Sequence, residues 1–401
     1  MIQNIETVVK ELDCCGCGAC INTCPVQAIK YQRDKYGFII PEINSTKCIF
    51  CRKCILTCPS LNSVKKKPKM AYAAKSLKNN VCLNSSSGGI FGTIAKFVLD
   101  RGGVIYGCMM DEKFEVRHIR VVSNDQLKEI MRSKYVQSYM GNVYQQVEND
   151  LKHNRLVLFS GTPCQVAALN NYVSDNVKDK LFMIDIVCHG VASQEFFDSY
   201  LNEIERQYGV IKNYIFRYKK TAKNGMNWYL AYCLKNTNRK KVRNWPEDIY
   251  GFLYMQAYIY RESCYKCKFS TLERVGDMTL CDFWGWEKYH SEFALGSAIS
   301  GVLINDSKAI NIWEKISNDL EYIETDIDNI KENNSCLVKP TMRPLNRDAL
   351  LEFWKKEGIM ELNRQFKKKN RKQIYKYFIL RNIPQCVVNV LLKIKLRLSE
   401  G

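Results

Sequence analysis

The 401-residue sequence has few histidines and no long apolar run. Only four histidines are present, His118, His153, His189 and His290, and their spacing forms no pair suited to general acid–base catalysis. No apolar stretch approaches the roughly 20 residues that a membrane-spanning helix requires. The first twelve residues lack the apolar core of a secretory signal, so we expect a cytoplasmic protein.

Acidic residues are also scarce relative to basic ones, 41 against 60, which gives a formal net charge of +19. Residues 339–401 hold 16 Lys and Arg but only 5 Asp and Glu. We expect a helical basic tail there that packs on its own domain; a membrane-surface helix or contact with an acidic protein are the alternatives. No nucleic-acid recognition motif accompanies the charge, so we expect no nucleic-acid partner.

Cysteine is the residue that the sequence has in excess, with 19 copies. Abundant cysteine without a secretion signal indicates metal ligands and reduced thiols rather than disulfides. Two arrays share the spacing C-x2-C-x2-C-x3-C-P at an offset of 34 residues. They comprise Cys14, Cys17, Cys20 and Cys24, and then Cys48, Cys51, Cys54 and Cys58.

This spacing is typical of two-cluster ferredoxins, in which the fourth cysteine of each array binds the other [4Fe-4S] cluster. Zinc knuckles or disulfides are the alternatives, but zinc sites prefer two pairs of ligands. Pro25 and Pro59 are expected to begin helices. Cys15 falls outside the spacing and is interpreted as a bystander. The predicted ligand sets are Cys14, Cys17, Cys20 and Cys58 for one cluster, and Cys48, Cys51, Cys54 and Cys24 for the other.

The remaining chain is predicted to form an α/β layered domain and a helical tail behind this α+β ferredoxin-like module. Strands alternate with helices after residue 70, which indicates a sheet that is at least partly parallel. The predicted divisions are residues 1–62, a linker at 63–69, an α/β domain at 70–210, a second part at 211–338 and the basic helical tail at 339–401.

A third group of cysteines follows the predicted strands. Cys164 and Cys188 each come directly after a strand, and Cys264 and Cys267 form a C-x2-C pair. Four thiolates suffice for a third [4Fe-4S] cluster, which we predict here. Buried free thiols, a redox dithiol or zinc are the alternatives. His189, beside Cys188, could tune a cluster, protonate a substrate or satisfy a turn, and we favour the turn.

Two further stretches are rich in hydroxyl groups, glycine or charge. The first opens a predicted helix at 90–99, where free backbone N–H groups can hold phosphate, and the second adds a lysine. A simple helix cap with a surface lysine is the alternative. The stretches are Ser86, Ser87, Gly88 and Gly89, and Ser133, Lys134 and Tyr135.

In this order, behind the twin arrays, the motifs resemble the coenzyme F-420 hydrogenase/dehydrogenase beta-subunit family over about residues 5–301. Cys281 is a departure, because glycine is expected before the Asp-Phe-Trp-Gly turn. The resemblance implies an FAD-binding iron–sulfur flavoprotein that moves electrons between clusters and a hydride carrier or small substrate. The matching stretches are 86–89, 133–135, 161–165, 188–190, 264–267 and 282–285.

The resemblance also implies that residues 70–210 bind the flavin. FAD is then expected near Gly161, Thr162 and Pro163, close to Cys164, with its pyrophosphate on the two hydroxyl-rich stretches. A ferredoxin or a partner redox subunit would exchange electrons with the clusters. The expected substrate is a deazaflavin-type coenzyme or a metabolite, for instance of polysaccharide biosynthesis. The alternative is an electron-transfer subunit of a larger complex, with no substrate site of its own.

Overall fold

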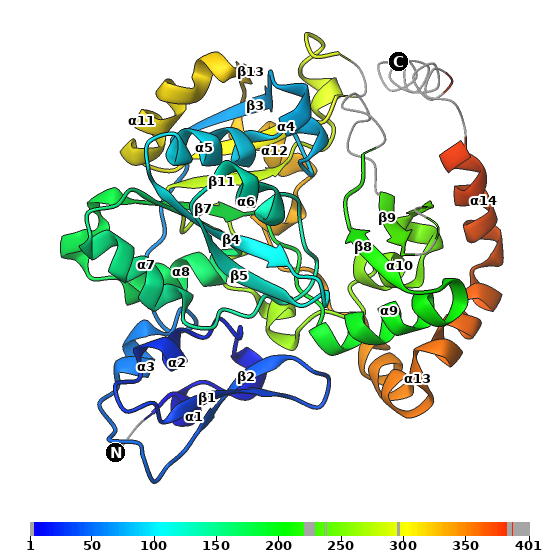
Figure 1. Ribbon diagram of the computed structural model, residues 1–401, viewed down its shortest axis with the longest axis horizontal. Helices are drawn as coiled ribbons and strands as arrows, with labels where there is room; N and C mark the ends of the chain where they lie inside the picture. The colour runs from blue at the N-terminus through cyan, green and yellow to red at the C-terminus, as the bar shows by residue number, and fades with distance from the viewer. Residues whose placement is uncertain are drawn as a thin grey trace.

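The computed structural model describes residues 4–219, 229–235, 237, 239–294, 297–382 and 387. It contains a small N-terminal module, a large sheet between layers of helices, and a three-stranded sheet enclosed by further helices (Figure 1). In this view the N-terminal module lies below the large sheet and the three-stranded sheet lies beside it.

The N-terminal module combines a hairpin with three short helices. The hairpin forms because Gly37 adopts a φ of +82° and Asp34 Oδ1 accepts two backbone N–H groups, from Tyr36 and Phe38, at 2.9 Å. The helices are α1 (Ile5–Val8), α2 (Ala19–Thr23) and α3 (Lys53–Thr57), and the antiparallel strands are β1 (Ile29–Arg33) and β2 (Ile39–Ile43).

The prediction that Pro25 and Pro59 begin helices is wrong. Helices α2 and α3 end before the fourth cysteine of each array, and both prolines lie in turns. Cys24 and Cys58 are extended, with ψ of 110° and 119°, because the ring of a following proline disfavours helical backbone at the residue before it.

The large sheet is mixed and has eight strands in the order β13-β3-β12-β11-β7-β6-β4-β5. β4, β6, β7 and β11 run parallel, and the other neighbours pair antiparallel, which confirms the expected α/β layer. The strands come from both sides of residue 210. They are β3 (Met70–Ser76), β4 (Val104–Met110), β5 (Val116–Val121), β6 (Val157–Gly161), β7 (Leu181–Ile186), β11 (Met278–Asp282), β12 (Ser300–Ile304) and β13 (Leu320–Glu324).

Helices cover both faces of this sheet because its central strands are apolar on both sides. Leu158 of β6 packs with α5, α6 and α11, whereas the next residue, Phe159, packs with α7 and α8. The helices are α4 (Asn79–Leu83), α5 (Ile90–Leu99), α6 (Asn124–Ile130), α7 (Val143–Lys152), α8 (Pro163–Tyr172), α11 (Ser307–Ile316) and α12 (Ile327–Glu332).

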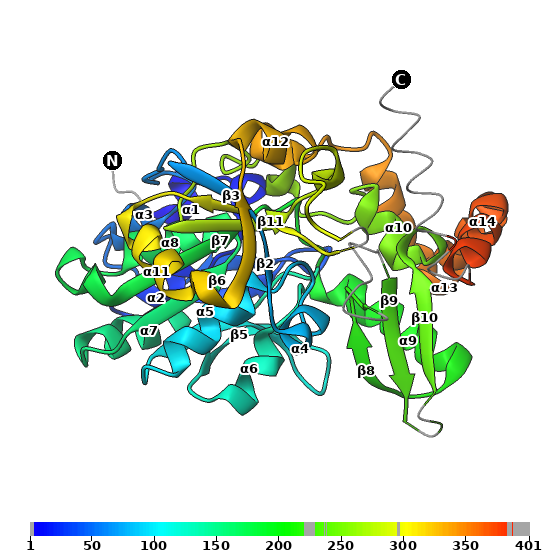
Figure 2. The same ribbon diagram turned by 90° about the horizontal axis from the view of Figure 1, so that it is seen from above.

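The three-stranded sheet is antiparallel, in the order β10-β9-β8, and is inserted between β7 and β11 in the chain. An aromatic core that includes Phe197, Tyr214 and Trp245 joins it to the surrounding helices. Figure 2 shows β8, β9 and β10 beside these helices. The strands are β8 (Ile211–Ile215), β9 (Tyr229–Leu234) and β10 (Lys240–Asn244), and the helices are α9 (Gln194–Tyr208), α10 (Ile249–Met255), α13 (Arg347–Lys369) and α14 (Arg371–Asn382).

The basic tail begins with a loop at 339–346 and is helical from Arg347 to Asn382 apart from a bend and a short break. Helix α13 bends at Gly358, which has a φ of +80°, and α14 follows after Asn370. Residues 388–401 lie outside the described part of the chain. Among the described helices, none has the length and apolar character needed to cross a bilayer.

Candidate iron–sulfur and cofactor sites

The first predicted ligand set surrounds one cavity. A cavity of about 310 Å³ is lined by Cys14, Cys17 and Cys20 from the first array and by Cys58 from the second. Burial raises the pKa of the Cys20 thiol well above its usual value, and the thiols of Cys14 and Cys58 raise it further. Three cysteines from one loop and one from the distant helix end therefore face a common space.

The second predicted ligand set surrounds another, smaller cavity. Cys48, Cys51 and Cys54 line it together with Cys24 from the first array, and its volume is about 20 Å³. The Cys24 Sγ accepts a hydrogen bond of 3.2 Å from the backbone N–H of Ala28. The structure thus brings the fourth cysteine of each array to the other array, because α2 and α3 pack side by side.

The thiols of these two ligand sets surround cavities and do not converge on the position of a single metal ion. In the part of the chain that the structure describes, no three or more His, Cys, Asp or Glu side chains are placed to hold a single metal ion. A tetrahedral zinc site draws its sulfur ligands to about 2.3 Å from one centre. The first cavity, of about 310 Å³, instead leaves a volume between its four thiols, which fits the larger body of a cluster.

The third predicted group comes together from three elements. Cys164 lies in the first turn of α8 and Cys188 follows β7, while Cys264 and Cys267 lie on or beside the 3-10 helix η4 (Glu262–Lys266). Burial raises the pKa of Cys188 well above its usual value, and Cys264 and Cys267 raise it further. Strands β6 and β7 are parallel neighbours, so their carboxyl ends place Cys164 and Cys188 at the same edge of the sheet.

Cys15, interpreted from the sequence as a bystander, lies between the first and third groups. Its thiol packs with Cys164 against the core that contains Cys17, and the interactions with these two cysteines lower the pKa of Cys15 well below its usual value. The same contact, together with burial, raises the pKa of Cys164. Spacing gave no signal for this role, since the contact forms only when α8 packs against the first array.

Arg261 is a second residue that sequence reasoning missed. Its buried guanidinium donates to the carbonyl oxygens of Cys14, at 2.6 Å, and Ile39, at 2.8 Å. Its positive charge lowers the pKa of the Cys14 thiol, against the larger raising effect of burial. A fixed cation beside Cys14 and near Cys264 favours negative charge on both cysteine groups.

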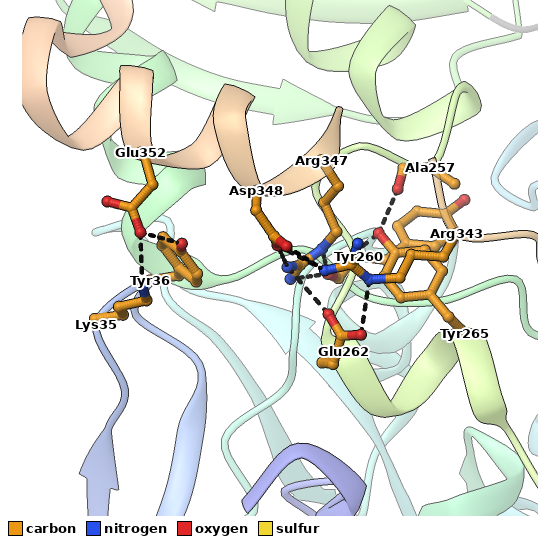
Figure 3. A network of polar contacts seen from close by, with 10 residues as sticks. All are labelled: Lys35, Tyr36, Ala257, Tyr260, Glu262, Tyr265, Arg343, Arg347, Asp348 and Glu352. Carbon is orange, nitrogen blue, oxygen red and sulfur yellow. Dashed lines mark hydrogen bonds and ion pairs between the residues drawn. The ribbon is translucent and has the colours of Figure 1, made fainter. Parts of the chain in front are cut away.

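A polar network holds η4 in place from the outside. Glu262 pairs with Arg343 at 2.8 Å and with Arg347 at 3.2 Å, and Arg347 also donates to the carbonyl oxygen of Tyr260 (Figure 3). Tyr265 donates to the carbonyl oxygen of Ala257. The C-x2-C pair is therefore anchored by the start of α13, a segment far away in the sequence.

The loop at 86–89, predicted to hold phosphate, is packed closely inside the fold. The Ser87 hydroxyl donates to the carbonyl oxygen of Ile299, and the Gly88 N–H donates to the Ser300 hydroxyl at 2.9 Å. A side chain at position 88 would meet the carbonyl oxygen of Ala74 at 2.4 Å. Gly89, with a φ of +92°, is the N-cap of α5.

The second predicted stretch lies beside this loop, but its lysine points elsewhere. The Ser133 N–H donates to the Ser86 hydroxyl at 2.8 Å, so the two stretches touch. Lys134 Nζ instead donates to the carbonyl oxygens of Glu129 and Met131, at 2.9 and 2.7 Å, near the end of α6. Burial lowers the pKa of Lys134 to about 8. The structure does not bring this ammonium group to the 86–89 loop.

Other cations, which the sequence did not indicate, occupy that position. Arg217 donates to the carbonyl oxygen of Ser86 at 3.3 Å and pairs with Asp282 at 2.8 Å. Lys219 Nζ donates to the carbonyl oxygens of Cys82 and Ser87, at 2.9 and 2.5 Å. Burial lowers the pKa of Lys219 to about 8. These side chains reach the loop from the segment that follows β8, which is distant in sequence.

Arg132 adds a third cation. Its side chain donates to the carbonyl oxygen of Leu83 and to Asn84 Oδ1 at 3.0 Å. Its Nε atom is buried and has no hydrogen-bond partner within the described residues. Burial lowers the pKa of Arg132, and its charge contributes to the lowered pKa of Lys219. A diphosphate group fits this arrangement, because it would neutralise crowded cations and supply an acceptor to Arg132 Nε.

The remaining predicted cofactor residues lie at the end of β6. Thr162 caps α8 together with Gln165, and Pro163 is in the first turn of that helix. The Thr162 hydroxyl lies 3.2 Å from the Cys164 sulfur. Gly161 has Gln165 and Phe159 as its close neighbours. This turn therefore adjoins the third cysteine group, as expected.

Two regions of the chain that contain these cysteine groups match known protein families. Residues 13–62 match the model of the 4Fe-4S dicluster domain. Residues 154–329 match the model of the C terminus of the coenzyme F420 hydrogenase/dehydrogenase beta subunit. Residues 154–329 belong to this beta-subunit family. The resemblance predicted from the motifs is confirmed, and the N-terminal module is an iron–sulfur domain.

Other comparisons are more distant. A chain of the F420-reducing [NiFe] hydrogenase complex from Methanosarcina barkeri is 14% identical, with a TM-score of 0.44. The likeness covers 77% of the present chain and 92% of that chain, and at this level it supports no inference about function. Among curated proteins, no match is found.

Within the beta-subunit region, His189 contacts a cysteine that lies beyond the matched residues. Its Nδ1 lies 3.3 Å from the sulfur of Cys336, and its carbonyl oxygen accepts a hydrogen bond of 2.9 Å from Thr341. Burial is the largest single influence and lowers the pKa of His189, but the hydrogen bond with Cys336 and the negative charges of Cys336 and Asp282 together give a net upward shift. The backbone bond supports the expected turn, and the imidazole has a further partner that spacing did not reveal.

Cys281 stands where the family resemblance led us to expect glycine, and the neighbouring strand leaves room for its side chain. The Cys281 thiol donates to the carbonyl oxygen of Gly301, at 3.5 Å, on β12. A side chain at position 301 would meet the Cys281 sulfur at 2.7 Å. Glycine thus stands across from Cys281 rather than in its place, so the side chain fits without moving β11.

Proposed function

We propose that the chain is an iron–sulfur flavoprotein oxidoreductase. It would pass electrons between [4Fe-4S] clusters and FAD in order to reduce or oxidise a small substrate or hydride carrier. The single observation that carries this proposal is the continuity of the cysteine groups. The first group touches the third through Cys15, and the third adjoins the turn at Gly161, Thr162 and Pro163.

The first two clusters would be held by the two sets of four cysteines that line the cavities. Each set combines three cysteines of one loop with the fourth of the other array. The loops supply thiolates, and the surrounding apolar residues Ile5, Ile21 and Ile39 of the first cavity exclude water. A buried cluster next to Arg261 would have its added electron stabilised by the guanidinium charge.

The third cluster would be held by Cys164, Cys188, Cys264 and Cys267. These cysteines come from α8, from the segment after β7 and from η4, and the network at the start of α13 holds η4. Cys15 would then lie against Cys164 as a neighbour of the cluster.

FAD would be held by the loop 86–89, with Ser133 and Tyr135 beside it. Arg132, Arg217 and Lys219 supply the positive charge for its pyrophosphate. A flavin exchanges single electrons with clusters and hydride with organic substrates, which is the chemistry that clusters alone cannot supply. A deazaflavin-type coenzyme or another metabolite, for instance of polysaccharide biosynthesis, would be the substrate.

The metal content tests the clusters. Anaerobically purified protein should contain about twelve irons per chain for three cubanes, against about eight for two. Replacing Cys264 and Cys267 by alanine should remove about four irons and leave the N-terminal clusters in place. Cys233→Ala is the matched control, since this cysteine lies on β9 away from the three groups. An unchanged iron content in the double variant would rule out the third site.

The cofactor released by acid tests the flavin. Acid destroys clusters but leaves FAD yellow and fluorescent, and about one FAD per chain is expected for one site. Reduction of a dye by candidate hydride donors should then proceed with the purified chain alone. Fully iron-loaded protein that neither carries nor takes up FAD would leave the alternative, an electron-transfer subunit that works with a partner redox subunit.

A further inference from the structure

The two cysteine loops share a backbone conformation but carry different residues on it. Gly16 and Gly18 of the first loop have φ values of +66° and +74°, and Phe50 and Arg52, 34 positions later, have +53° and +63°. Left-handed backbone costs a non-glycine residue roughly 1–2 kcal/mol. The second loop therefore retains a phenylalanine and an arginine where glycine would be less strained.

Packing explains the glycines of the first loop. A side chain at position 16 would meet Gln137 Nε2 at 2.2 Å, and one at position 18 would meet the Tyr31 hydroxyl at 2.3 Å. The second loop is not covered in this way: Ile49 is 60% exposed, Phe50 is 41% exposed, and Cys51 is exposed as well. Strained positions in the second loop thus present large side chains to solvent.

The second loop is also more basic than the first. Residues 44–70 contain seven Lys and Arg and no Asp or Glu, whereas the equivalent residues 10–36 contain four and three. Lys66 is engaged with Asp277 and Asp306 of the large sheet. Lys47, Arg52 and Lys53 are exposed beside the second cavity. The exposed cluster loop is therefore apolar at its centre and basic at its edge.

We propose that this face is the docking surface for a small acidic protein that carries single electrons. We call it the second-loop face, made of Val26, Ile49, Phe50, Arg52 and Lys53, all of which line the second cavity. The proposal rests on the proposed function. Complementary charge guides a weak electron-transfer partner to its site, and a small apolar centre excludes water from the contact.

The position of this face agrees with a linear order of the proposed clusters, in which the second cluster lies at the surface and the first lies between it and the third. The first loop is closed off by the main domain, where the Tyr144 hydroxyl donates to the carbonyl oxygen of Cys17 at 3.0 Å. Only the second loop of the two leaves a ligand cysteine, Cys51, exposed. An outside carrier would therefore reach the second cluster, and the first cluster would connect it to the third.

Rapid mixing with a reduced, purified acidic two-cluster ferredoxin tests this proposal on the full chain. The chain is loaded with Mössbauer-active iron and the ferredoxin is not, so rapid-freeze Mössbauer spectra report reduction of the chain's own clusters alone. The compared variants are Arg52→Glu with Lys53→Glu, and Phe50→Gly. At low salt the charge reversal should lower the second-order rate at least about tenfold and abolish most of its salt dependence. Phe50→Gly relieves backbone strain, so its unfolding midpoint should not fall, while the rate should still drop several-fold.

Two controls separate docking from damage to the clusters. The iron content of every variant is measured, and reduction by the small viologen radical, which needs no protein interface, should remain fast. Lys367→Glu with Lys368→Glu reverses the same charge at the end of α13 and should leave the ferredoxin rate unchanged. Equal ferredoxin rates in the wild type and the second-loop variants would overturn the proposal, as would a loss confined to the α13 variant.

The same data separate this proposal from the proposed function. If the chain lacks FAD but the ferredoxin rate still depends on Phe50, Arg52 and Lys53, the docking surface stands and the flavoprotein assignment fails. If viologen reduces bound FAD while these substitutions leave the ferredoxin rate unchanged, the flavoprotein assignment stands and the docking surface fails.

Discussion

At the scale of single residues, the basic side chains around the 86–89 loop decide how an anionic cofactor would be held. The sequence points to Lys134, because it stands between Ser133 and Tyr135 in a family stretch. Its ammonium group, however, is bonded to two carbonyl oxygens near the end of α6. Arg217 and Lys219 reach the loop instead, from a segment that carries no motif.

We therefore expect Arg217→Gln and Lys219→Gln to lower FAD occupancy severalfold, because each removes a charge from the pyrophosphate contact. Lys134→Gln is the matched control and should retain occupancy close to that of the wild type. Flavin released by acid, quantified per iron, is the measurement. Loss of FAD in the Lys134 variant alone would show that the cofactor binds in another position. Gly88→Val is unsuitable for this test, since the side chain would collide with Ala74.

A second prediction for a single residue concerns His118, which is buried. Its Nε2 donates to the carbonyl oxygen of Ser160 at 3.1 Å, and its Nδ1 is hydrogen-bonded to the Ser138 hydroxyl at 2.7 Å. Burial lowers the pKa of His118 to about 4. Because the neutral ring is favoured in the folded state, its contribution is complete above pH 6.5 and is lost as the pH falls towards 4. The loss amounts to about 3 kcal/mol at most.

The measurement is the unfolding midpoint of the apoprotein between pH 4 and 7. His118→Gln should weaken the decline with falling pH, since the residue that must be protonated has been removed. His153→Gln, at the exposed end of α7, should preserve the wild-type slope. Parallel curves for His118→Gln and the wild type would contradict the assignment.

At the scale of elements, a buried ion pair fixes the C-x2-C segment to the sheet. Asp185, at the end of β7, accepts from Arg274 at 2.7 Å and from the backbone N–H groups of Val275 and Gly276. Arg274 also donates to the carbonyl oxygen of Phe269. The two residues are 0% and 2% exposed in their side chains, so neither charge can turn to water.

We expect Asp185→Ala to lower the free energy of unfolding by about 3–5 kcal/mol, because it leaves the Arg274 guanidinium buried and unpaired. The proposed third cluster should be lost with it, which iron analysis would show as a fall of about four irons. Asp100→Ala breaks an exposed pair with Lys96 and should cost about 0.5 kcal/mol or less. Equal urea midpoints for the two variants would refute this role.

At the scale of the whole molecule, α13 joins two parts that are distant from it in sequence. Arg347, at its start, is buried and bonded to Tyr260 and Glu262, while Glu352 accepts from Lys35 and Tyr36 of the N-terminal hairpin, at 2.5 and 2.6 Å (Figure 3). The helix therefore links the iron–sulfur domain to the C-x2-C segment.

Arg347→Met leaves Glu262 and the Tyr260 carbonyl oxygen without their buried donor. We expect this to loosen the contact of α13 with the C-x2-C segment and, through the helix, its contact with the N-terminal hairpin. We expect a loss of about 2–4 kcal/mol, and faster hydrogen exchange in residues 29–43 and 257–267. Arg364→Met removes only an exposed pair with Glu361 on the same helix and should alter neither segment. Unchanged exchange in both variants would show that α13 is a passive cover.

The sequence by itself determined the two cysteine arrays and the resemblance to the family, and it predicted the crossed pairing of the ligands. Ligand spacing within a short loop is a local property, so Cys14, Cys17 and Cys20 could be predicted from spacing alone. The alternation of apolar strands and capped helices, read locally, predicted the parallel centre of the sheet. The preference of proline for the first turn of a helix gave a wrong prediction at Pro25 and Pro59, because each of these prolines follows a helix and does not begin one.

Only the tertiary structure decided which distant side chains meet. The contact of Cys15 with Cys164, the position of Arg261 beside Cys14 and the approach of Arg217 to Ser86 join segments that have no spacing in common. Such contacts arise from how helices and loops pack on the sheet, and packing depends on the shape and burial of the whole core. The reach of Lys134 away from the predicted loop has the same cause, because burial favours the carbonyl oxygens nearest to its ammonium group.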